Sequence, residues 1–159
     1  MLACDYPAHL DFWTALLDRL GVRPRHTHDA PTPGIVVTST VDRAGQRLLH
    51  VLNVSPVDQS FSIHRDGTPL LGGTRLTLPA RTGRMLPLDL HLPSADLLWS
   101  TAELAESSDT LTLKAADLPA RALIRTTGEL DAPGAEITRD GPLATLTWST
   151  TDSVVITVT

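Results

Sequence analysis

The carboxylates at residues 96–109, DLLWSTAELAESSD, are the side chains best suited to bond-breaking chemistry. This stretch holds Asp96, Glu103, Glu106 and Asp109. Glycosidic hydrolysis uses two carboxyl groups about 5 to 9.5 Å apart across a bound sugar. Such pairs usually come from different strands that line a cleft, and this spacing does not fix which carboxylates converge, so we interpret the run as a solvated strand end and loop. Glu103 differs because it follows WSTA, where a partly buried carboxylate needs an arginine or a backbone N–H as hydrogen-bond donor.

Three residues of metal-ligating type follow one another in His26-x-His28-Asp29. Zinc needs three or four ligands in matched geometry, and the sequence supplies no second cluster to complete such a set. We therefore interpret this segment as a solvated, proline-flanked linker without a metal.

Nucleophilic and nucleotide-dependent chemistry lack their usual motifs. The serines occur outside any G-x-S-x-G elbow, and Cys4 has no evident histidine partner. Neither G-x-G-x-x-G nor a P-loop pattern occurs. The sequence therefore predicts no catalytic residues and no cofactor.

Sugar binding would require an exposed aromatic ring, because aromatic faces match the apolar faces of pyranoses. Trp99 lies in line with Leu97 and fits either the core or a stacking platform, and we favour the core. Trp148 shares a face with Ala144 and Leu146 and is predicted to be core. Trp99 and Glu103 are therefore the candidate carbohydrate-binding residues.

His50 lies inside the apolar stretch QRLLHVLNVSP at residues 46–56. It shares a face with Leu48 and Leu52, and the alternate positions are also apolar. We predict that His50 is a hydrogen-bonded residue of the core or its edge, and that Asn53 with Ser55 forms the hydrogen-bonded exit from a central strand.

These residues must be positioned by two kinds of element, and the first is a helix predicted over residues 7–20. Its apolar stripe recurs at helical spacing, and Gly21 follows as a helix-ending glycine. The proline-rich segment 22–34 is predicted to be a linker. The helix either covers an open end of the following domain or ends a preceding one, and we favour the second for residues 1–21.

Short β-branched or leucine-rich runs separated by turn residues fill residues 35–159. Leu86, Leu88, Leu90 and Leu92 alternate with other residues and are predicted to share one face. The pattern predicts a mainly β fold, an antiparallel β-sandwich of one or two packed sheets of short strands, preceded by one N-terminal amphipathic helix.

Composition narrows the classes of partner. The chain has 159 residues and a net charge of −5 without a clustered basic patch, so nucleic acid is not an expected partner. The apolar runs are far shorter than the roughly 20 residues that cross a bilayer, so no membrane partner is expected. The single cysteine suits a reducing compartment and predicts a cytoplasmic location.

Three stretches together resemble the C-terminal region of bacterial β-galactosidases: FWTALLDRLGVRP, PGIVVTSTVDRAGQRLLHVLNVSP and LTLPARTGRMLPLDLHLPSADLLWSTAEL. The resemblance covers residues 8–115 and is to glycoside hydrolase family 35, with a looser likeness to family 42. It implies a noncatalytic domain that follows a catalytic (β/α)₈ barrel and an α/β domain. The family's catalytic glutamates belong to the barrel, and no position here matches their motifs.

Three functions follow as hypotheses. The first is an accessory β-sandwich that supports the catalytic barrel of a β-galactosidase or its subunit assembly. The second is an independent carbohydrate-binding module, which predicts an exposed ring at Trp99 or Tyr6 and binding of β-galactosides. The third is a self-sufficient hydrolase, which requires two convergent carboxylates; for this chain alone we expect no turnover.

Overall fold

The computed structural model describes residues 6–107, 110–150 and 153–159. It is mainly β with antiparallel sheets, and within these residues one α-helix precedes the strands, which confirms the predicted fold class. No helix in the described part of the chain is long and apolar enough to cross a membrane.

Within the described residues, the elements follow one another as one α-helix, sixteen strands and a short 3₁₀ helix, η1. Their bounds are α1 (Tyr6–Arg19), β1 (His26–His28), β2 (Ile35–Val41), β3 (Arg47–Asn53), β4 (Gln59–Phe61), β5 (Ile63–Arg65), β6 (Thr68–Pro69), η1 (Leu71–Gly73), β7 (Leu76–Leu78), β8 (Thr82–Leu92), β9 (Ala95–Ser100), β10 (Glu103–Ser107), β11 (Leu111–Lys114), β12 (Ala120–Arg125), β13 (Leu130–Asp131), β14 (Glu136–Asp140), β15 (Leu143–Trp148) and β16 (Ser153–Val158).

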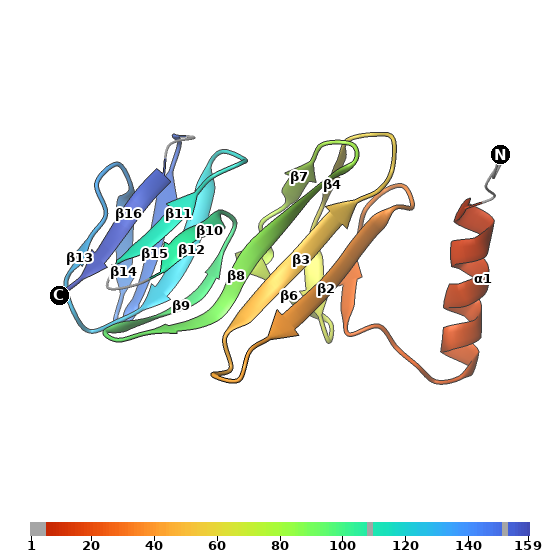
Figure 1. The fold of residues 1–159 in the computed structure, drawn as a ribbon, viewed down its shortest axis with the longest axis horizontal. Coiled ribbons are helices and arrows are strands. Elements are labelled where there is room, and N and C mark those ends of the chain that lie inside the picture. The colour runs from red at the N-terminus through yellow and green to blue at the C-terminus, as the bar shows by residue number, and fades with distance from the viewer. Residues whose placement is uncertain (1–5, 108–109, 151–152) are drawn as a thin grey trace.

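A seven-stranded antiparallel sheet, in the order β14-β15-β12-β9-β8-β3-β2, runs through the whole β region. Smaller sheets cover it in two places: β1-β5-β6 and β4-β7 cover the part nearer the N-terminus, and β10-β11-β16-β13 covers the other part. In Figure 1 the first group lies behind the large sheet and the second lies in front of it. The covering sheets therefore lie on opposite faces.

Two hydrophobic cores result, and they divide residues 35–159 into two lobes that share one sheet. The N-terminal core consists of Ile35, Leu49, Val51, Phe61, Ile63, Leu71, Leu76, Leu78, Leu86 and Leu88. The C-terminal core is built around Leu90, Leu97, Leu111, Leu113, Ile124, Leu146, Trp148, Val154 and Ile156, with several alanines between them. Trp148 is 2% exposed, as predicted for a core residue.

Strand β8 contributes to both cores because its alternation is interrupted at Asp89. Leu88 packs in the N-terminal core and Leu90 in the C-terminal core. Residues two apart on a regular strand share a face, but Asp89 has a φ of +51°. The prediction that all four leucines of this strand share one face is therefore wrong, since a left-handed residue between them redirects the second half of the strand.

Helix α1 lies to the side of β2, away from both cores (Figure 1). It ends in hydrogen bonds from Gly21 N–H to the Asp18 carbonyl (3.0 Å) and from Val22 N–H to the Leu17 carbonyl (2.9 Å). Gly21 adopts a φ of +73°, which a residue without a Cβ adopts at little cost. Within the segment predicted as a linker, β1 pairs with β5, so this stretch also contributes a strand to the N-terminal lobe.

Candidate functional site

Trp99 packs against the N-terminal core from its place on β9. Gly72 of η1 lies directly on the indole: a Cβ built on Gly72 would be 2.7 Å from Trp99 Cζ2. Gly72 has a φ of +62°, so both the backbone conformation and the contact favour glycine there. The ring is therefore half-buried and covered on one side by η1, and the sequence alone gave no signal of this contact.

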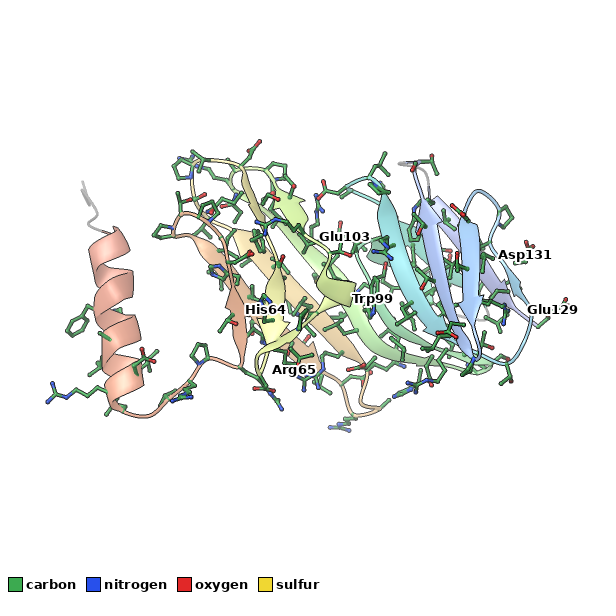
Figure 2. The ribbon with its side chains drawn as sticks, turned by 180° about the vertical axis from the view of Figure 1, so that it is seen from behind. His64, Arg65, Trp99, Glu103, Glu129 and Asp131 are labelled. Atoms are coloured by element: carbon green, nitrogen blue, oxygen red, sulfur yellow. The ribbon has the colours of Figure 1, made fainter. Side chains whose placement is uncertain are left out.

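The Glu103 side chain hydrogen-bonds the backbone of β8. Its Oε1 accepts a hydrogen bond from Met85 N–H at 3.0 Å. Strand β9 pairs with β8 only from Leu88 onward, so the carboxylate bonds a strand N–H beyond the end of that pairing. The sequence predicted that either an arginine or a backbone N–H would donate a hydrogen bond to Glu103, and the donor is a backbone N–H. Figure 2 shows Trp99 and Glu103 near the middle of the molecule, and the structure gives them different partners.

The other carboxylates of the acidic run also have separate surroundings. Asp96 Oδ1 lies 2.7 Å from His91 Nδ1, and its Oδ2 lies 3.9 Å from Arg125 Nη1. Glu106 is exposed on β10, and Asp109 lies outside the described residues. The described carboxylates of the run thus have no common partner.

The His26-x-His28-Asp29 segment does not gather its three side chains on one point. Asp29 Oδ1 accepts from Ser62 N–H (2.6 Å), and its Oδ2 accepts from Arg75 Nη1 (2.8 Å). The Ser62 hydrogen bond is the main cause that lowers the pKa of Asp29. His28 stacks edge-on against Phe61, and burial lowers the pKa of its imidazole. Among the described residues, no group of histidine, cysteine, aspartate and glutamate side chains is placed to hold a metal ion.

His50 and Asn53 have architectural partners. His50 lies half-buried on β3, with Nε2 2.9 Å from Thr40 Oγ1 of β2. Asn53, 1% exposed, donates from Nδ2 to the carbonyls of Val57, Leu78 and Pro79. These contacts agree with a hydrogen-bonded histidine at the core edge and a hydrogen-bonded strand exit.

A cleft of about 400 Å³ lies where the two lobes meet, and we call it the junction cleft. The N-terminal lobe contributes η1 and β7, and the C-terminal lobe contributes Thr101, Arg121 and the segment after β11. Its lining residues are Gly72, Gly73, Thr74, Arg75, Leu76, Thr77, Thr101, Asp117, Leu118, Pro119 and Arg121.

An ion pair joins the two lobes at this cleft. Arg84 Nη1 of β8 lies 2.7 Å from Asp117 Oδ2, and the same oxygen accepts from Thr77 N–H at 3.1 Å. Burial alone would raise the pKa of Asp117, but the hydrogen bond and charge of Arg84, with the Thr77 N–H, outweigh it and lower that pKa. Sequence reasoning missed this pair because its partners lie 33 positions apart and only the fold brings them together.

A second distinctive surface is formed by the apolar side of α1 and the leucine that directly follows its last residue. We call this surface the α1 stripe: Phe12, Trp13, Leu17 and Leu20. These side chains are 60%, 56%, 41% and 66% exposed. The two aromatic rings pack edge to face at 5.4 Å between centroids, so they form one continuous apolar surface.

Comparison of the sequence with protein-family models found no match, and comparison with curated proteins found none either.

Proposed function

We propose that this chain is a noncatalytic accessory β-sandwich of a β-galactosidase-like glycoside hydrolase, acting in the cytoplasm. In this proposal the α1 stripe packs against the rest of the enzyme, either the catalytic barrel or a neighbouring subunit. The family assignment rests on the resemblance of residues 8–115 described above.

The observation that carries the proposal is the exposure of the α1 stripe. Leu20 is 66% exposed and Trp13 56% exposed, although burial stabilises by about 25 cal/mol per Å² of apolar surface. The helix has the amphipathic pattern of one that packs against another element. Contiguous exposed apolar surfaces of this kind mark interaction sites.

The arrangement of the carboxylates supports an accessory role over hydrolysis. Glu103 bonds the Met85 N–H, and Asp96 is placed beside His91 and Arg125. A retaining or inverting hydrolase needs two carboxyl groups that face one substrate bond. Glu103 and Asp96 instead contact the protein's own backbone and side chains.

The decisive test is the genomic reading frame upstream of codon 1, together with the activity of the isolated chain. We expect the same frame to encode a (β/α)₈ barrel with paired catalytic glutamates. We also expect the purified 159-residue chain to show no hydrolysis of a chromogenic β-galactoside. An in-frame stop codon immediately upstream would contradict the accessory role, and turnover lost on Glu103→Gln would establish the hydrolase hypothesis instead.

A further inference from the structure

The junction cleft contains one positive charge that no carboxylate neutralises. Arg75 is paired with Asp29 at 2.8 Å, and Arg84 with Asp117 at 2.7 Å. Arg121, which also lines the cleft, has no ion-pair partner for its guanidinium among the described residues.

Arg121 is held in place by its backbone, which leaves its side chain free to bind. Its N–H donates to Thr101 Oγ1 at 2.9 Å, and its carbonyl accepts from Thr101 N–H at 2.9 Å. Both flanking residues of β12, Ala120 and Ala122, are fully buried in the C-terminal core. A planar guanidinium on such a rigid strand is suited to hold a carboxylate through two parallel hydrogen bonds.

One exposed hydroxyl group and one apolar side chain complete the lining. Thr74 also lines the cleft, but its Oγ1 is buried and presents no surface to a ligand. Thr77 is exposed on β7. Leu118, 45% exposed, supplies an apolar wall. Small-molecule sites commonly combine an apolar wall with a few placed polar groups in about 300 to 1,000 Å³.

We infer that the junction cleft binds a small polyhydroxy carboxylate. Arg121 holds the carboxylate, Thr77 bonds a hydroxyl group, and Leu118 covers a C–H face of the ligand. This inference is independent of the accessory role proposed above, because the described lining of the junction cleft includes no residue of α1 and the ligand is not a partner polypeptide.

The test compares two ligands that differ in one group, D-glucuronate and D-glucose, by titration into the ¹⁵N-labelled full chain. We expect glucuronate to cause saturable shifts in the amide signals of residues 72–77 and 117–121. Glucose at the same concentration should cause at least tenfold smaller shifts, because it has no carboxylate for Arg121. Inorganic phosphate should compete with glucuronate without reproducing the shift at Thr77.

Variants locate the binding and exclude a general charge effect. Arg121→Gln should weaken glucuronate binding at least tenfold while leaving the remaining spectrum unchanged. Arg125→Gln is the matched control: it removes the same charge from the same strand, at a side chain 56% exposed outside the cleft, and should leave binding within twofold. Thr77→Phe should block the cleft and abolish binding.

Several results would overturn the inference. These are equal shifts with glucose and glucuronate, undiminished glucuronate binding in Arg121→Gln, or equal losses in Arg121→Gln and Arg125→Gln. Phosphate binding without any glucuronate binding would identify an inorganic-anion site and would also overturn it.

Discussion

At the scale of single residues, Asn53 shows how one buried amide can fix the end of a strand. It donates to three carbonyls and its Oδ1 accepts from both Ser55 N–H and Ser55 Oγ. These five contacts join the end of β3 to the 55–57 loop and to the turn after β7. No aliphatic side chain of the same size can replace them.

Replacing Asn53 by Ala should therefore destabilise the chain strongly. Each buried group that loses its partner costs about 1 to 3 kcal/mol, and since the carbonyls share the Nδ2 hydrogens we expect a total loss of about 3 kcal/mol. Urea denaturation followed by circular dichroism measures it. Thr38→Ala, at an exposed position of the neighbouring strand β2, is the control. It should change the unfolding free energy by less than about 0.5 kcal/mol. A similarly small loss for Asn53→Ala would refute the role given to the Asn53 amide.

The residue types themselves carried much of this information. An Asn-x-Ser-Pro exit from an apolar strand predicts local hydrogen bonding from Asn53 and Ser55, and the structure shows it. Trp99 was different: its position fitted two environments, and Gly72, whose missing Cβ decides between them, lies 27 positions earlier. Only the fold brings these two residues into contact.

At the scale of elements, the loop that follows β11 clamps the start of β8 and the middle of β7. Asp117 accepts from Thr77 N–H and pairs with Arg84, whose side chain is 6% exposed. Removing one partner of a buried pair leaves the other charge without compensation. This clamp lies at the boundary of the two lobes.

Asp117→Asn should lower stability at pH 7 and reduce its acid dependence. The folded pKa of Asp117 is lowered relative to about 3.9 in the unfolded chain, so its contribution is complete above about pH 4 and is lost as the pH falls through the folded value. Asp117 is 35% exposed, so we expect about 2 kcal/mol at pH 7, below the usual range for breaking buried pairs. Urea midpoints at pH 7 and pH 3 should show the difference from the unmodified chain shrinking at pH 3.

Asp131→Asn provides the comparison, because Asp131 is exposed on β13. It should change neither midpoint appreciably. A difference between Asp117→Asn and the unmodified chain that stayed constant from pH 7 to pH 3 would show that the clamp is not electrostatic.

For the α1 stripe we predict almost no effect on the stability of the sheets. Because α1 lies apart from both cores (Figure 1), the double substitution Leu17→Ser, Leu20→Ser should change the unfolding free energy of the sheets by less than about 0.5 kcal/mol. Leu146→Ala, at a fully buried position, should cost about 2 to 5 kcal/mol. A loss above about 1.5 kcal/mol in the double variant would mean that the helix packs on the sheets, and would remove the main support for an external partner.

The elements were predicted best where the pattern is local. Helical spacing over residues 7–20 and alternation over many short strands predicted one helix and an antiparallel β fold. The reversal at Asp89 could not be foreseen, because aspartate adopts a positive φ only when its surroundings require it. The alternating leucines therefore predicted the strand correctly, but they did not show that its two halves pack in different cores.

At the scale of the whole molecule, the shared sheet makes the two cores depend on each other. Strand β8 places Leu86 and Leu88 in one core and Leu90 in the other, and β9 places Leu97 in the C-terminal core while Trp99 packs on the N-terminal one. Strands β8 and β9 belong to both cores, so unfolding of either core disorders strands on which the other core depends. The N-terminal core is also held to the C-terminal lobe by the Arg84–Asp117 pair.

We therefore expect the two lobes to unfold in one transition. The chain has three tryptophans, and each reports on a different place: Trp13 on α1, Trp99 on the N-terminal core and Trp148 in the C-terminal core. In a Trp13→Phe background, adding Trp148→Phe or Trp99→Phe leaves one tryptophan per chain, and each substitution has its own stability cost. Each variant's fluorescence curve in urea should coincide with its own circular-dichroism curve within about 0.2 M, as a two-state transition requires. A fluorescence transition separated from the circular-dichroism transition of the same variant would mean that one lobe melts alone, and that the continuity of β8 does not couple the cores.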